Sequence, residues 1–246
     1  MTKKPAEQQS AALVFGGSRG IGAAIARQLA DDGFAVGLTY LGNIDKAAAV
    51  CESISAAGGR AIALQSDSRD PTAVRAAIET VSKQLGPLDV IVVNAGVLRM
   101  NPFHSFPLED FDLLFSVNVR GVFLAIQASI PFLRDGGRII TIGSNVAVRT
   151  GSPEGGVYAM TKAAVAKMVE GLALELAPRG ITVNNVQPGP TLTDLTAEFA
   201  DRIVDKIPLK RLGKPAEIAS LVSYLASSDA GFITGASLTI DGGFVL

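Results

Sequence analysis

The chain has 246 residues, 48% hydrophobic and 18% charged, which is enough apolar material for a sizeable core. Its formal net charge is -1 and its basic residues are scattered, so we expect neither nucleic acid nor an anionic membrane as a partner. A single cysteine, Cys51, excludes an internal disulfide. Without a recognisable secretory signal or a sufficiently long apolar run, the sequence predicts a cytoplasmic protein.

Strand-like and helix-like stretches alternate along the whole chain. Short apolar or β-rich runs predict strands at 11–15, 34–40, 61–65, 88–93, 138–142, 181–187 and 237–240. Helical spacing predicts helices at 21–33, 47–57, after Asp70-Pro71, at 109–133 and 157–177, and after Pro215. Near-continuous apolar strands are typical of parallel sheets covered on both faces. We therefore predict a polar extension at 1–10 and one α/β domain at 11–246, a three-layer doubly wound sheet of about seven strands (Rossmann-type).

The turn after the first predicted strand is rich in glycine and reads Gly16-Gly17-Ser18-Arg19-Gly20-Ile21-Gly22. Glycines at a strand-to-helix turn let the backbone approach a pyrophosphate, whose charge is met by the N–H groups of the helix N-terminus. Glycines also serve simply to make tight turns. The position of this turn, between a strand and an amphipathic helix, favours a dinucleotide site.

The end of the second predicted strand suggests which dinucleotide binds. It reads Thr39-Tyr40-Leu41-Gly42-Asn43 and lacks the carboxylate that an NAD site uses to bind the ribose hydroxyls. Such a carboxylate would repel a 2′-phosphate, whereas the guanidinium of Arg19 could bind one. Arg19 could also be a solvated loop charge. Because the acid is missing and a base is present, we predict NADPH/NADP+ as the cofactor, with Tyr40 in contact.

A second group of polar residues follows later in the chain. Tyr158 and Lys162 are four residues apart in a predicted helix and so share one face. On its own this spacing is weak evidence and also fits a half-buried tyrosine above a solvated lysine. Ser144 lies fourteen residues before Tyr158 at the end of a predicted strand, and Asn118 lies in the helix before it.

The glycine turn, Asn118, Ser144 and the Tyr158–Lys162 pair, in that order, resemble the short-chain dehydrogenase/reductase family over essentially the whole chain. One departure is Phe15, which occupies the place of a family threonine whose hydroxyl helps to hold the turn. The segment 211–219 resembles that of 3-oxoacyl-acyl-carrier-protein reductases. By analogy, the resemblance implies a homotetramer that pairs helices around 111–133 and 157–177, and the C-terminal strands, between subunits.

The resemblance also assigns further cofactor contacts. Asp67 corresponds to the aspartate that binds the adenine amino group, with Ser68 beside it. Small residues at Asn94-Ala95-Gly96 allow close approach to the adenosine ribose. The segment after the sixth strand would hold the nicotinamide carboxamide through Pro188, Gly189, Thr191 and Thr193. Each segment could also be turn chemistry without a ligand, but all follow carboxyl ends of strands, where such sheets bind ligands.

The resemblance implies a role for each residue of the second group in reducing a ketone. Tyr158 would donate the proton to the carbonyl oxygen, and Ser144 would stabilise the charge that develops there. Lys162 would bind the nicotinamide ribose and, with the oxidised nicotinamide, lower the pKa of Tyr158 from about 10 toward the working range. Asn118 would hold a water that links the lysine to solvent.

Three functions remain open from the sequence. The leading one is NADPH-dependent reduction of a small-molecule carbonyl substrate: a small ketone, a ketoester or a 3-oxoacyl thioester. A sugar or polyol dehydrogenase is a second, against which the missing NAD carboxylate argues. The third is a nucleotide-binding regulator, since two segments resemble a short-chain relative that binds cyclic-di-GMP. The only histidine, His104, has no suitably spaced partners, so we predict no metal site.

Overall fold

Seven parallel strands form one sheet in the computed structural model, which describes residues 10–194, 196 and 203–246. The strand order is β3-β2-β1-β4-β5-β6-β7, so the order reverses beside β1 as it does in a doubly wound sheet. The strands are β1 (Ala11–Phe15), β2 (Ala35–Tyr40), β3 (Ala61–Gln65), β4 (Leu88–Val93), β5 (Leu133–Ile142), β6 (Thr182–Pro188) and β7 (Ser237–Ile240). The predicted fold class is confirmed. Of the predicted polar extension, only Ser10 lies within the described residues.

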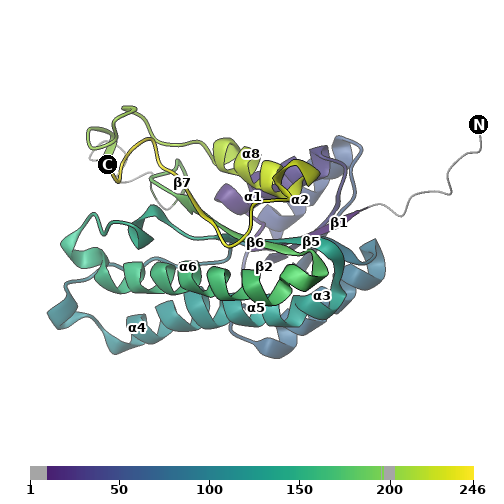
Figure 1. The fold of residues 1–246 in the computed structure, drawn as a ribbon, viewed down its shortest axis with the longest axis horizontal. Coiled ribbons are helices and arrows are strands. Elements are labelled where there is room, and N and C mark those ends of the chain that lie inside the picture. The colour runs from purple at the N-terminus through teal and green to yellow at the C-terminus, as the bar shows by residue number, and fades with distance from the viewer. Residues whose placement is uncertain (1–9, 195, 197–202) are drawn as a thin grey trace, which may run out of the picture.

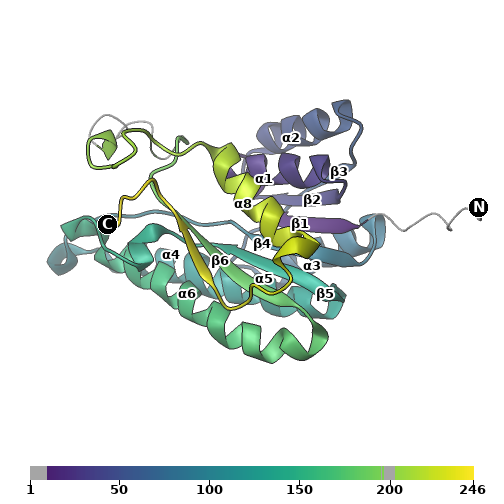
Figure 2. The ribbon, with the colours of Figure 1, turned by 45° about the horizontal axis from the view of Figure 1, so that its top comes forward.

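Helices cover both faces of the sheet and make three layers (Figures 1 and 2). One face carries α1 (Gly20–Asp31), α2 (Ile44–Ala56) and α8 (Pro215–Ala226). The other carries α3 (Pro71–Leu85), α4 (Leu108–Phe115), α5 (Val122–Ser129) and α6 (Gly156–Leu176). The loops that follow the strands meet at one edge of the sheet, where the carboxyl ends of the strands lie.

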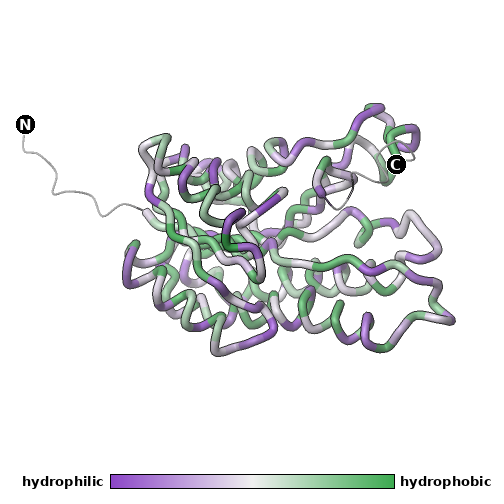
Figure 3. The backbone as a smooth tube through the Cα atoms, turned by 180° about the vertical axis from the view of Figure 1, so that it is seen from behind, coloured by the Kyte–Doolittle hydropathy of each residue, from purple (hydrophilic) through white to green (hydrophobic). Residues whose placement is uncertain are grey.

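The core is divided in two by the sheet because side chains alternate along each strand. In β1, Leu13 and Phe15 join the cluster under α3, α5 and α6, whereas Ala12 and Val14 join the cluster under α1, α2 and α8. All five residues of β1 are buried. In Figure 3 the central strands are coloured mostly as hydrophobic along their length. This double burial explains the near-continuous apolar runs in the sequence.

Side-chain caps fix the start of two helices near the functional edge. Asp70 accepts a hydrogen bond from the backbone of Thr72 at 2.8 Å, and Pro71 occupies the first helical position of α3, as predicted. Asn43 accepts from the backbone of Lys46 at 2.9 Å and so starts α2 three residues earlier than the sequence indicated.

The predicted helix at 109–133 is interrupted in the structure. Between α4 and α5 the chain forms a π-helical segment, η2 (Ser116–Gly121), and after α5 a short 3-10 turn, η3 (Ile130–Phe132). The predicted strand at 138–142 begins earlier, at Leu133, which pairs with Leu88 across a register shift. Apolar periodicity does not distinguish a π-helical turn from an α-helical one, so the interruption could not be read from the sequence.

Within the described residues, the continuous helical stretch Leu108–Phe132 is long and apolar enough to cross a membrane by length and composition. In the fold it belongs to the helix layer on the sheet. Leu114, Val122 and Ile126 from this stretch are buried. Its apolar composition is therefore that of a helix which packs against the protein core.

Candidate functional site

A cavity of about 380 Å³ lies at the carboxyl ends of β1 to β4. Twelve residues that the sequence predicted as cofactor contacts line it, namely Gly16, Ser18, Arg19, Gly20, Ile21, Tyr40, Asp67, Ser68, Asn94, Ala95, Gly96 and Thr193. Thr39, Leu41, Ser66, Arg69, Val97, Leu113, Val117 and Asp194 line it as well. Loops after four neighbouring strands thus meet around one space at the edge where such sheets bind ligands.

The glycine turn is tight enough to exclude side chains. A Cβ on Gly16 would lie 2.8 Å from Cα of Ala95, and one on Gly22 would lie 2.1 Å from the carbonyl oxygen of Gly16. Asn94 donates from Nδ2 to that same carbonyl at 2.8 Å. Gly16 also has φ of 76°, which favours glycine. Bare backbone therefore faces the cavity at the start of α1, as a pyrophosphate requires.

A hydroxyl from a different strand stabilises this turn. Thr39 of β2 accepts a hydrogen bond from the backbone N–H of Gly16 at 3.0 Å through its Oγ1. Phe15, which takes the place of the family threonine, is buried in the core instead. In the sequence, Thr39 is recognisable only as part of a strand end. Its role depends on the pairing of β1 with β2, which joins residues far apart in the chain.

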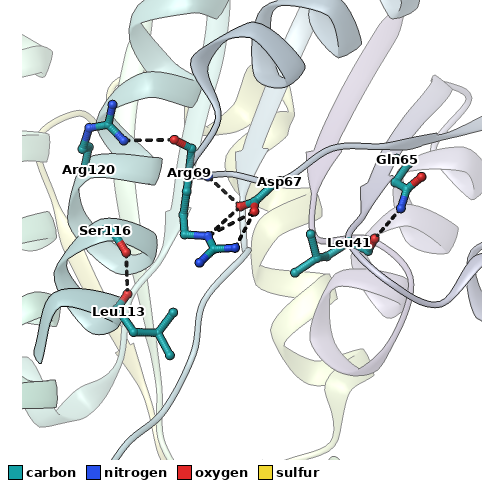
Figure 4. A network of polar contacts seen from close by, with 7 residues as sticks. All are labelled: Leu41, Gln65, Asp67, Arg69, Leu113, Ser116 and Arg120. Carbon is teal, nitrogen blue, oxygen red and sulfur yellow. Dashed lines mark hydrogen bonds and ion pairs between the residues drawn. The ribbon is translucent and has the colours of Figure 1, made fainter. Parts of the chain in front are cut away.

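Asp67 is held by an arginine that sequence reasoning missed. Arg69 donates from Nε and Nη2 to the two oxygens of Asp67 at 3.0 and 2.6 Å, and its backbone N–H donates to Oδ1 at 2.9 Å. Arg120 in turn donates to the carbonyl of Arg69 (Figure 4). The hydrogen bonds from Arg69 lower the pKa of Asp67, so the carboxylate is ionised at the cavity wall.

Ser66 carries a buried hydroxyl with no hydrogen-bond partner. Its side chain is 5% exposed and it lines the cavity beside Asp67. A buried hydroxyl without a partner costs about 1–3 kcal/mol, so such groups are usually satisfied. A polar ligand bound in the cavity would give this hydroxyl a partner. Together with the bare glycine turn, it means that the residues present fit a dinucleotide.

An acidic side chain from another segment of the chain lies close to Arg19. Arg19, the predicted base, lies with Nη1 3.6 Å from Oδ2 of Asp194. Lys46, in the first turn of α2, places Nζ 3.0 Å from the same oxygen. The end of β2 lacks a carboxylate, as the sequence shows, but Asp194 reaches this place from the loop after β6. The end of β2 is thus free of acid, as predicted, while Asp194 pairs with the two cations near it.

Tyr158 and Ser144 lie together, with Lys162 behind the tyrosine. The Ser144 hydroxyl lies close enough to that of Tyr158 to affect its pKa, and Nζ of Lys162 is 5.7 Å from the centre of the tyrosine ring. Burial raises the pKa of Tyr158 to about 12, and the Ser144 hydroxyl partly opposes this rise because it favours the tyrosinate. From the sequence we expected Lys162 and the bound oxidised nicotinamide together to lower this pKa. In the chain by itself, desolvation of the tyrosinate is the larger effect.

Lys162 is a buried lysine near the inner end of the cavity. Its Nζ donates to the carbonyl oxygen of Ile142 at 3.1 Å, and burial lowers its pKa to about 8. A Cβ on Gly96 would lie 3.6 Å from this Nζ. Gly96 also lines the cavity, so the lysine stands where the nucleotide cavity meets the Tyr158 and Ser144 pair.

Asn118 is buried and connects the loop after β4 to α6 through hydrogen bonds. Its Oδ1 accepts from the backbone of Val97 at 2.9 Å, and its Nδ2 donates to the carbonyl of Val97 and to Oγ1 of Thr161. Thr161 in turn donates to the carbonyl of Tyr158 at 2.7 Å. Asn118 sits in the π-helical η2, a local form that often marks functional positions. Its side chain thus holds the loop against the start of α6, and its amide protons are already used.

In the segment after β6, some residues make structural contacts and others line the cavity. Gly189 packs against Asp241, where a Cβ would lie 2.4 Å from Cβ of that residue. Thr191 donates its hydroxyl to the carbonyl of Gly189 at 2.9 Å. Pro188 ends β6, and none of these three lines the cavity. Thr193 does line it, with its methyl group 3.4 Å from a Cβ on Gly20.

His104 lies exposed in a short 3-10 turn, and among the described residues no group of three or more His, Cys, Asp or Glu side chains could hold a metal ion.

The chain is similar in sequence and in structure to known proteins. Residues 16–245 match the family model described as Enoyl-(Acyl carrier protein) reductase. The chain is 41% identical to the 3-oxoacyl-(acyl-carrier-protein) reductase FabG of Staphylococcus aureus, over 96% of this chain and 98% of that protein. It is 40% identical to the cyclic-di-GMP-binding biofilm dispersal mediator protein of Escherichia coli, over 94% and 95% respectively. A solved short chain dehydrogenase from Burkholderia cenocepacia in complex with NADP is 44% identical, with a TM-score of 0.94 over 97% of this chain and 99% of that one.

Proposed function

The chain belongs to the short-chain dehydrogenase/reductase family, and we propose that it is an NADPH-dependent reductase that converts a ketone to a secondary alcohol. One observation carries this proposal. Tyr158 lies beside Ser144 and Lys162 where Lys162 approaches Gly96 on the wall of the nucleotide cavity, and with a pKa well above 7 it holds its proton at neutral pH. A protonated tyrosine beside a nucleotide cavity is a proton donor, which is what reduction of a carbonyl requires.

Different residues of the chain would carry out different parts of the reaction. NADPH, when bound, supplies the hydride to the carbonyl carbon. Tyr158 donates the proton from its hydroxyl to the carbonyl oxygen, and Ser144 donates a hydrogen bond to the same oxygen as negative charge develops. Lys162 favours the tyrosinate that remains, which is then reprotonated from solvent. Asn118 positions α6 through Thr161 and so acts through other residues rather than on the substrate.

The residues that would hold the cofactor follow the cavity. The glycine turn would take the pyrophosphate, while Asp67 and Ser66 would face the adenosine half. Arg19 would meet the 2′-phosphate, as the sequence predicts. The NADP complex of the Burkholderia relative supports this choice.

Ser66→Ala is expected to have opposite effects on stability and on binding. Because the hydroxyl is buried without a partner, removing it should leave the melting temperature of the ligand-free chain unchanged or raise it. NADPH should bind about fivefold more weakly, since one hydrogen bond is lost. Calorimetric titration and thermal denaturation measure the two effects.

The matched control is Ser129→Ala, because Ser129 is also buried but donates to the carbonyl of Ala125 at 2.7 Å. That change should lower stability and leave NADPH binding unaltered. Unaltered NADPH binding in Ser66→Ala would remove this residue from the cofactor site.

A substrate panel tests the proposed activity. Oxidation of NADPH is followed with β-ketoesters, acetoacetyl thioester, cyclic ketones, quinones and sugars, and each assay is repeated with NADH. An enoyl thioester is added because the matching family model is described as an enoyl reductase. We expect turnover of at least one ketone with higher kcat/KM for NADPH than for NADH. Turnover of the enoyl thioester alone, or preferred oxidation of a polyol, would contradict the proposal.

A cyclic-di-GMP-binding regulator is the second candidate, favoured by the 40% identity to the Escherichia coli mediator protein. Its ligand is a nucleotide, and the cavity of this chain is built for one. Titration with cyclic-di-GMP, in competition with NADPH, separates the candidates. Saturable binding of cyclic-di-GMP without ketone turnover would favour the regulator.

We also propose that the protein forms a homotetramer and works in the cytoplasm without a membrane partner. Apolar side chains are exposed on the helices expected to pair, including Leu108, Phe123 and Met160. Sedimentation equilibrium should then give about four times the 25.4 kDa of one chain, and a monomer would contradict the assembly.

A further inference from the structure

Two cations from separate loops converge on one carboxylate oxygen at the mouth of the cavity. Arg19, between β1 and α1, and Lys46, in the first turn of α2, have nitrogens 3.6 and 3.0 Å from Oδ2 of Asp194. All three side chains are about half exposed or more, so neither pair is enforced by burial. Exposed ion pairs of this kind are weak and are screened by salt. A stronger anion can therefore take the place of the carboxylate.

The position of these cations identifies the anion. Arg19 and Asp194 line the cavity together with Tyr40 and Leu41, which end β2. In a doubly wound sheet the end of the second strand faces the 2′ position of the adenosine ribose. A phosphate at that position would lie within reach of both nitrogens, because they already meet at a single oxygen.

We propose that Lys46 binds the 2′-phosphate of NADPH together with Arg19, and that Asp194 occupies the phosphate's place until the cofactor binds. Lys46 lies in the first turn of α2, which the Asn43 cap starts. Asp194 belongs to the loop that follows β6, so the arriving phosphate displaces a residue from the other half of the molecule. The inference rests on the proposed preference for NADPH and adds the residues that decide it.

Binding to the cofactor fragments 2′,5′-ADP and 5′-AMP isolates the phosphate. Lys46→Gln should weaken NADPH and 2′,5′-ADP about tenfold, the scale of one charge-assisted hydrogen bond, while NADH and 5′-AMP are unaffected. Asp194→Asn should strengthen NADPH and 2′,5′-ADP about threefold, because a competing negative charge is removed. Lys83→Gln, in the last turn of α3, is the matched control and should change none of these affinities.

Calorimetric titration at low and at physiological salt gives all the dissociation constants without reference to turnover. In the double variant Lys46→Gln, Asp194→Asn, the increase in NADPH affinity caused by Asp194→Asn should be smaller than in the single variant. The Lys46 ammonium, for which Asp194 and the phosphate compete, is then missing. If Lys46→Gln keeps the full preference for 2′,5′-ADP over 5′-AMP, or Asp194→Asn weakens NADPH, the inference is wrong. If the unmodified protein binds NADH as tightly as NADPH, the proposed cofactor preference fails instead.

Discussion

Tyr158→Phe should lower kcat for ketone reduction about a thousandfold, the scale of a lost general acid. The change removes only the hydroxyl beside Ser144 and leaves the ring in place under Nζ of Lys162. Affinity for NADPH should stay the same, because Tyr158 does not line the nucleotide cavity. Stopped-flow or steady-state kinetics beside calorimetric titration separate the two effects.

Tyr224→Phe provides the control, since Tyr224 is exposed on α8, on the opposite face of the sheet from α6. It should retain full activity. Turnover by Tyr158→Phe within a few-fold of the unmodified enzyme would mean that the proton comes from another group.

Lys162→Met should abolish most activity while making the ligand-free protein more stable. Burial lowers the pKa of Lys162 from 10.5 to about 8, and a difference of this size corresponds to about 3 kcal/mol of destabilisation at neutral pH. Losing the hydrogen bond that the ammonium donates to the carbonyl of Ile142 offsets about 2 kcal/mol of this, because the donor is charged. We therefore expect a net gain of about 1 kcal/mol in the free energy of unfolding, with kcat reduced about a hundredfold or more.

The gain in the free energy of unfolding of Lys162→Met should be largest below pH 8 and should decrease at higher pH. Below pH 8 the folded chain carries the full cost of a charged buried lysine, so the difference between Lys162→Met and the unmodified protein is largest there. Between pH 8 and 10.5 the lysine is neutral in the folded state but still charged in the unfolded state, so the difference shrinks. Denaturant titrations across this range measure it.

Lys167→Met, on the exposed side of the same helix, is the control and should show no such dependence. A Lys162→Met variant less stable than the unmodified protein at pH 7 would show that the lysine is not buried at a cost.

The sheet and the glycine turn were predictable because their signals are local. Buried parallel strands appear in the sequence as apolar runs such as 88–93. Asp70-Pro71 predicts the start of a helix from two adjacent residues, without knowledge of the rest of the fold. The tyrosine and lysine pair was likewise readable from a spacing of four residues within one helix.

What the sequence did not reveal depends on contacts between distant segments. Lys46 and Asp194 are 148 residues apart and meet only because loops after β2 and β6 end at the same edge. The free hydroxyl of Ser66 is recognisable only once its surroundings are known. The burial of Tyr158, which raises its pKa in the chain without cofactor, could not be read from the sequence either.

Transfer of hydride from NADPH to a carbonyl carbon is the central claim, and isotope labelling tests it most directly. NADPH carrying deuterium at the transferable position of its nicotinamide is incubated with the best ketone of the panel, and the alcohol is analysed by mass spectrometry. We predict one deuterium on the carbinol carbon for each NADPH oxidised, with the product lost in Tyr158→Phe. An unlabelled alcohol, or NADPH oxidised without any alcohol, would contradict the assignment.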